Sequence, residues 1–266
     1  MTMVQGTLML NRPYIIVLML LATTQLLAQD SSYTFKENDF VNISSSASLQ
    51  AETGMTIECW ANPELETYSD YAPLVHYFRL GGGDQESGFA LQYFQGEVRF
   101  MVSVGTGAND IYGDGLQLWP GINLEQNTWT HVAGTYDAAT GEAKIFKNGI
   151  EEASFNTEGG NINWDFIETV NMKIGKSEIN PASSDSYFDG GIDEVRLWDI
   201  PLDQVTIQNG ICNSPLGGGG LLGYWNFNDG NDLTISDLTG NGNNGTMVVA
   251  GDGYWDSDAY ENNPLC

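Results

Sequence analysis

Residues 129–154 read WTHVAGTYDAATGEAKIFKNGIEEAS, and this stretch indicates antiparallel β-strands joined by tight turns. Apolar and polar side chains alternate over Thr130–Asp137 and over Ala143–Lys147, with the period of two that a strand with one buried face shows. The segment DAATGE joins the two runs, and Asn148-Gly149 is a favoured pair for a hairpin turn leading into IEEASF. The stretch therefore predicts consecutive β-hairpins.

Short alternating runs recur on both sides of this stretch, separated by turn residues. One helix is predicted, at Leu202–Asn209 between Pro201 and Gly210. With 32 glycines, this pattern predicts an all-β, two-sheet antiparallel sandwich. The other candidate strands are Tyr33–Ile43, Met55–Asn62, Ala72–Arg79, Gly88–Tyr93, Glu97–Val104, Lys173–Gly175, Gly191–Asp199, Gly223–Asn226 and Thr246–Val249.

The N-terminal segment has the composition of an export signal. An apolar run, Tyr14–Leu21, follows Arg12, and the small residue Ala28 offers a cleavage point. The alternative is a membrane anchor, but the run falls well short of the roughly 20 residues that span a bilayer. We therefore expect residues 1–28 to be a signal peptide and residues 29–266 to form one secreted domain without a membrane span.

The charge balance limits the choice of partner. The chain carries 9 basic and 35 acidic residues, a net charge of −26. Such a chain repels polyanions, so nucleic acid is excluded as a partner. The acidic residues have two interpretations that can both hold: they keep a secreted protein soluble, or clustered Asp and Asn oxygens bind a hard divalent cation.

Three cysteines leave one unpaired in an oxidising compartment. Cys59 alternates with apolar residues in MTIECWA, which predicts a buried thiol. Cys212 follows the predicted helix and Cys266 ends the chain, so a disulfide between them would tie down the C-terminal tail. The sequence leaves open that Cys266 pairs with another chain.

Five segments, taken in order, resemble the laminin-G-like domains of the concanavalin A-like superfamily. They are FKENDFVNISSSASLQ, MTIECWANP, the stretch quoted above, GGIDEVRLWDIPLDQVTIQ and GYWNFNDGNDLTISDLTGNGNNGTM. The resemblance spans roughly residues 33–255. It implies a jelly-roll sandwich of two packed antiparallel sheets, about six or seven strands each, with the N- and C-terminal strands paired.

A structural calcium near the paired termini is a further implication of that resemblance. In ISDLTGNGNNG, Asp237 and nearby asparagines supply several oxygens, and glycines let carbonyls point inward, as calcium with six to eight oxygen ligands requires. The alternative is a turn held by side-chain-to-backbone hydrogen bonds. The family often has Asp-Gly after its first Phe, and this chain has Lys36-Glu37 there. The expected ligand set is Asn38, Asp39, Asp237 and Asn243.

The predicted function is recognition without catalysis. Sugar rings stack on aromatic side chains beside amides and carboxylates, which makes loop aromatics candidate glycan ligands: Trp119, Trp164, Tyr112 and Tyr187. A retaining glycosidase needs two carboxyl groups about 5 Å apart. Asp193 and Glu194 are adjacent and are expected to point to opposite faces, while Glu194 and Arg196 are expected to form a surface ion pair.

The histidines lack the residues that would make them catalytic. His76 and His131 lie in apolar strand contexts with no nucleophile motif or second ligand nearby. We therefore predict a secreted glycan-binding module. The alternatives are a protein-adhesion or extracellular-matrix module and, less favoured, a glycoside hydrolase or polysaccharide lyase.

Overall fold

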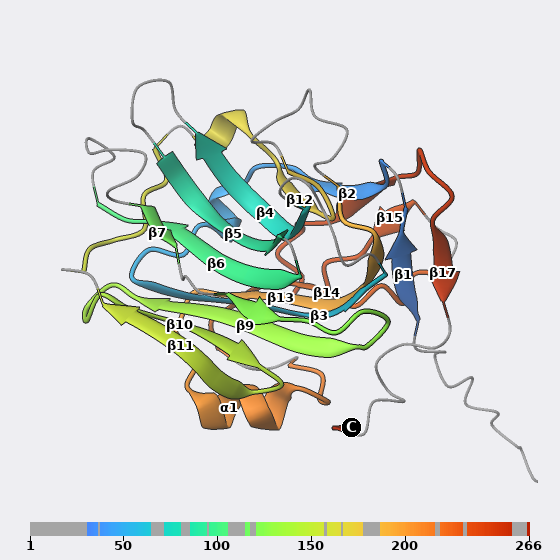
Figure 1. The fold of residues 1–266 in the computed structure, drawn as a ribbon. Helices are drawn as coiled ribbons and strands as arrows, with labels where there is room; N and C mark the ends of the chain where they lie inside the picture. The colour runs from blue at the N-terminus through green and yellow to red at the C-terminus, as the bar shows by residue number, and fades with distance from the viewer. Residues whose placement is uncertain are drawn as a thin grey trace, which may run out of the picture.

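The structure is a computed structural model of two β-sheets packed face to face, with a short helix outside one of them (Figure 1). The described residues are 31–36, 38–64, 72–80, 86–94, 96–105, 115–117, 121–156, 159–165, 167–177, 187–215, 219–230, 233–256 and 265–266. The predicted signal peptide therefore lies outside them.

Sheet A has eight strands. Its order is β11 (Ile150–Asn156), β10 (Glu142–Lys147), β9 (Thr130–Asp137), β3 (Gly54–Pro63), β13 (Gly190–Trp198), β1 (Ser32–Phe35) and β17 (Tyr254–Asp256), with β14 (Leu221–Trp225) also beside β13. All its pairings are antiparallel, and β9, β10 and β11 form the consecutive hairpins predicted from residues 129–154. The N-terminal strand β1 pairs with β17, which confirms the expected pairing of the chain's ends.

Sheet B has nine strands. Its order is β15 (Thr234–Ile235), β16 (Gly245–Val248), β2 (Phe40–Ile43), β12 (Met172–Ile174), β4 (Ala72–Leu80), β5 (Glu86–Phe94), β6 (Glu97–Ser103) and β7 (Gly115–Gln117), with β8 (Ile122–Asn123) also beside β6. Two single-turn 3-10 helices, Ala47–Leu49 and Ile167–Thr169, lie in the connections. Both sheets exceed the expected six or seven strands.

The main core lies between the sheets. Alternate residues along each strand point into it, and across sheet B the inward positions are fully buried at Val41, Ile174, Val75, Leu91 and Phe100. Cys59 projects into the same core from β3 as a free, buried thiol, as predicted. The outward positions on the same strands are the ones available for function.

A second apolar cluster covers the outer face of sheet A. Helix α1 (Gln204–Gly210) packs there, on the side away from sheet B (Figure 1). Its Ile207 joins Trp60, Phe146, Trp198 and Ile211 in this cluster, which is separate from the main core. The outer face of sheet A is therefore covered by the protein itself over β3, β9, β10 and β13, whereas β11 at the edge is largely exposed.

Two element boundaries differ from the sequence prediction. Tyr33–Ile43 is not one strand: β1 ends at Phe35 and β2 begins at Phe40. Between them the Asp39 N–H donates to the Lys36 carbonyl at 2.8 Å, and Asn38 adopts φ 71°. Asparagine tolerates this left-handed conformation better than most residues, which makes the turn possible. The helix begins at Gln204, not Leu202, because the Asp203 carboxylate accepts a hydrogen bond from the Thr206 N–H at 2.7 Å and caps it.

Candidate functional site

A row of outward-facing side chains crosses the middle of sheet B. Residues directly opposite each other on antiparallel strands share a face. The register joins Asn42 to Lys173, Lys173 to His76, His76 to Ala90, and Ala90 to Met101. Gln92 and Arg99 are also directly opposite each other, two residues further along β5 and β6. The row therefore brings polar side chains from five strands together on one face.

Two side chains on this face are buried without hydrogen-bond partners. His76 is 0% exposed and Gln92 1% exposed. Neither ring nitrogen of His76 has a hydrogen-bond partner, and neither amide atom of Gln92 has one. Burial, together with the nearby charge of Lys173, lowers the pKa of His76 to about 3, so its ring is neutral at pH 7. Burying polar atoms unpaired costs free energy, so these two groups are a candidate for ligand binding.

Aromatic and cationic groups meet at the β2 end of the row. The Lys176 Nζ lies 4.5 Å from the Phe40 ring centroid and 5.0 Å from that of Tyr187. The Lys173 Nζ lies 5.7 Å from the Phe40 centroid and donates to the Asn42 Oδ1 at 3.2 Å. Phe40, Tyr187 and Lys176 are half-buried, whereas Lys173 is only 5% exposed. This end combines partly open aromatic rings with ammonium groups.

Acidic side chains occupy the two far ends of the β5–β6 hairpin. Glu97 forms an ion pair with Arg99 at 3.5 Å beside the hairpin turn. Glu86 begins β5 and has its pKa raised to about 7 by burial. Eight residues of extended strand separate Glu86 from the position opposite Glu97, a distance of roughly 27 Å. These two carboxyl groups therefore do not form a catalytic pair.

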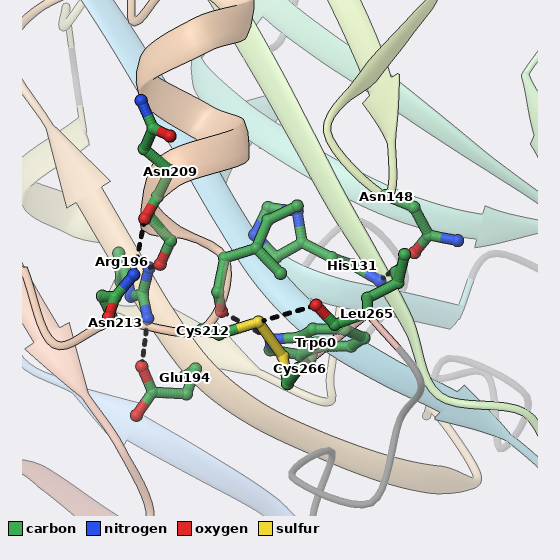
Figure 2. The surroundings of a disulfide bond; sticks show 12 residues. Trp60, His131, Asn148, Glu194, Arg196, Asn209, Cys212, Asn213, Leu265 and Cys266 are labelled. Carbon is green, nitrogen blue, oxygen red and sulfur yellow. Dashed lines mark hydrogen bonds and ion pairs between the residues drawn. A yellow bond between two sulfur atoms is a disulfide. The ribbon is translucent and has the colours of Figure 1, made fainter.

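The outer face of sheet A holds a buried ionic network, of which Figure 2 shows His131 and the Glu194–Arg196 pair. The Glu58 carboxylate lies 3.3 Å from the His131 Nε2 and 3.7 Å from Arg196, and accepts from the Trp198 indole at 3.0 Å. Burial opposes the ionisation of Glu58, but His131 and Arg196 outweigh it and lower its pKa. Because Glu58 has a hydrogen bond from Trp198 and charged neighbours under the apolar cluster, it is held as a structural carboxylate.

The sequence interpretation of Asp193 and Glu194 is corrected by a β-bulge. The register against β3 shifts between Asp193 and Arg196, and Glu194 adopts φ 51°. Strict alternation fails there, so Glu194 contacts Arg196 and accepts from the Tyr224 hydroxyl at 2.7 Å on the outer face. Asp193 is on that face too, directly opposite Trp60. The Glu194–Arg196 pair forms as predicted, but it is buried rather than at the surface.

The predicted disulfide joins Cys212 to Cys266 beside this network (Figure 2). The Trp60 indole donates to the Ile211 carbonyl at 3.2 Å, and Arg196 donates to the Gly210 carbonyl at 2.8 Å. These bonds hold the end of α1 and the disulfide-bonded segment against sheet A.

The expected calcium ligands do not form one oxygen site. Asp39 is buried and accepts from the backbone N–H groups of Ala250, Gly251 and Gly253 at 2.7–2.9 Å. Asp237 instead accepts from the N–H groups of Thr239 and Asn243, each at 3.0 Å. Asn243 contacts Ser48 and Leu222, and Asn38 is exposed in its turn.

N–H hydrogens therefore point at the carboxylate oxygens where a cation would need to bind. Within the described residues, no group of three acidic, Cys or His side chains is suited to a metal. The donor set does not fit calcium, and the clamp expected of a metal is supplied by Asp39, which binds the β1–β2 turn to residues 250–253. Calcium binding itself stays a prediction.

The four candidate aromatics are distributed differently from the expectation. Trp119 and Tyr112 lie outside the described residues. Trp164 packs against Tyr77 and Phe89 of the core side, and its indole N–H donates to the Ala51 carbonyl at 2.7 Å. Tyr187 alone is placed on the polar face of sheet B, beside Phe40 and Lys176.

Comparison with known proteins agrees with this architecture. A family model described as the concanavalin A-like lectin/glucanases superfamily matches residues 35–208. The chain belongs to this superfamily. No relative is found among curated protein sequences. Among the described residues, no helix has the length and apolar character needed to cross a membrane.

Solved structures share the concanavalin A-like fold at low sequence identity. A proposed carbohydrate-binding protein from Bacteroides ovatus is 18% identical with a TM-score of 0.62, over 85% of this chain and 59% of that one. The full extracellular region of zebrafish Gpr126/Adgrg6 is 12% identical with a TM-score of 0.52, over 87% of this chain and 27% of that one. The chain thus spans well under two thirds of either protein, and the likeness shows the fold alone.

The sequence prediction missed the polar row on this concanavalin A-like sandwich. His76 was interpreted as an ordinary sheet residue because its neighbours Val75 and Tyr77 are apolar. Alternation along each strand was the signal that could have identified the row. His76, Lys173 and Gln92 each lie at an outward position between two apolar residues that point inward. Their shared row depends on strand register, which a single segment does not reveal.

Proposed function

We propose that the protein is an exported, non-catalytic glycan-recognition module that binds its ligand on the outer face of sheet B. The proposal depends above all on His76 and Gln92, whose four polar side-chain atoms are buried and unpartnered. Each sugar hydroxyl both donates and accepts hydrogen bonds, so a glycan is suited to the neutral His76 ring and the Gln92 amide. A ligand without hydroxyl groups at these positions would leave the buried polar atoms of the protein unpaired. The site would therefore discriminate against such a ligand.

Several other observations support the proposal. Phe40 and Tyr187 offer partly exposed ring faces for stacking at one end of the row. The superfamily's description includes lectins, and a Bacteroides ovatus protein with this fold carries a proposed carbohydrate-binding role. A disulfide and a predicted signal peptide suit an oxidising compartment outside the cytoplasm. Absence of catalysis is supported by Glu58 and Glu194, which are engaged beneath α1.

Glycan-array binding tests this function directly. We expect the purified protein to bind a subset of glycans, and His76→Leu and Gln92→Leu each to weaken that binding at least tenfold, about 1.4 kcal/mol. Gln208→Leu, on the exposed surface of α1, is the matched control and should leave binding unchanged. Wild-type affinity in both sheet B variants would refute the proposed site, and no binding to any glycan would refute the function.

A further inference from the structure

We infer that the glycan carries a negative charge, a carboxylate or a sulfate, which is held by the ammonium group of Lys176, with the buried charge of Lys173 beside the same Phe40 ring. The inference rests on the proposed function and specifies the ligand class of the same face. Both ammonium groups lie beside the Phe40 ring, and Lys176 is also beside Tyr187. An isolated bridge between Lys176 and Tyr187 fixes the two backbones next to each other.

Lys176 differs from Lys36 and Lys144 in what surrounds its charge. Lys36 pairs with Glu64 and Asp189, and Lys144 pairs with Glu142 and Glu151. Within the described part of the chain, no carboxylate oxygen lies within 4.0 Å of the Lys176 Nζ, although the protein has 35 acidic residues. Two aromatic rings hold this ammonium instead, which orients it while leaving its N–H donors available.

The position of these lysines suits a charged sugar better than a neutral one. Lys173 is 95% buried in the polar row, between Asn42 and His76, so its charge acts in a region of lowered dielectric. Hydrogen bonds from an ammonium to an anion are roughly twice as strong as neutral ones. A ring stacked on Tyr187 or Phe40 would present its acidic group to Lys176 and its hydroxyls to the row.

Matched glycans separate the charge from the sugar ring. Because the acidic chain repels extended polyanions, each charged probe carries a single acidic group: a galacturonate-terminated oligosaccharide is compared with its methyl ester, and a monosulfated galactan oligosaccharide with its desulfated form. We expect titration calorimetry to show at least tenfold tighter binding of a charged member than of its neutral counterpart, with affinity falling as salt rises. The pair that shows this preference distinguishes a carboxylate from a sulfate.

Lysine variants locate the effect. Lys176→Gln should reduce the charged glycan's affinity to that of the neutral one, Lys176→Arg should retain most of the preference, and Lys144→Gln on sheet A should change nothing. Thermal unfolding of each variant verifies that it is folded. Equal binding of charged and neutral members overturns the inference and leaves glycan recognition standing. Failure to bind any of these members by a protein that does bind glycans on the array overturns the inference alone, and failure to bind any glycan on the array overturns both.

Discussion

The outer faces of the two sheets bury polar side chains in different ways. On sheet A, Glu58 and Glu194 have charged or hydrogen-bonding partners in Arg196, Trp198 and Tyr224, although some atoms of this network, among them both His131 ring nitrogens, make no hydrogen bond. On sheet B, His76 and Gln92 are as deeply buried but have neither an ion-pair nor a hydrogen-bond partner among the described residues. The charged partners make the sheet A network structural, whereas the unpartnered groups of sheet B support the proposed ligand site.

Replacing Arg196, the cation that Glu58 and Glu194 of sheet A share, should have the largest effect on the free energy of unfolding. Arg196→Met leaves Glu58 and Glu194 buried without it, and losing one partner of a buried ion pair costs about 3–5 kcal/mol. Lys144→Met, at an exposed ion pair of the same sheet, should cost no more than about 1 kcal/mol. Urea denaturation measures both. Similar losses in the two variants would show that the sheet A network is not needed for stability.

Breaking the disulfide should have the next largest effect, because it constrains the segment beside the sheet A network. Cys212 and Cys266 are 54 residues apart. In the chain-entropy model such a loop contributes about 4 kcal/mol, and measured values commonly fall between about 2 and 4. Cys212→Ser should lower the urea midpoint accordingly. Reductant should destabilise the wild type equally and have no effect on the variant; an unchanged wild-type midpoint would contradict the prediction.

The contrast between the two sheet faces also shows which structural features the sequence alone could predict. Alternation within one segment predicted the strands of the 129–154 stretch, the burial of Cys59 and the shared side of Glu194 and Arg196. It did not predict that α1 would cover that side, because the covering residues come from later in the chain. The bulge at Glu194 was hidden because a positive φ at a glutamate has no local sequence signal.

The sequence also did not show the surroundings of the expected calcium ligands, for a related reason. Spacing showed that Asp39 and Asp237 were near turn residues, but it did not show which groups would reach their carboxylates. The donors to Asp39 come from residues 250–253, more than 200 positions away in the chain. Likewise, the row on sheet B joins β2, β12, β4, β5 and β6 through register that only the folded sheet defines.

Acid should lower the free energy of unfolding through the protonation of His76. Its folded pKa of about 3 lies below the ordinary value near 6.5, so the unfolded chain binds the proton more readily. Stability is therefore lost as pH falls below about 6.5, by an amount on the order of 3 kcal/mol at pH 4. His76→Leu should lack this part of the acid dependence. Parallel stability curves for the variant and the wild type between pH 7 and pH 4 would contradict the assignment.

The smallest expected effect on stability, that of His76→Leu at pH 7, distinguishes the two sheet faces most clearly. At pH 7, His76→Leu removes two buried polar atoms that have no partners, so the free energy of unfolding should change by less than about 1 kcal/mol or rise slightly. Urea denaturation at pH 7 checks this. A loss above about 2 kcal/mol would mean that His76 has a structural partner, as the sheet A residues do. Unchanged stability with lost glycan binding is instead the behaviour of a side chain kept for its ligand.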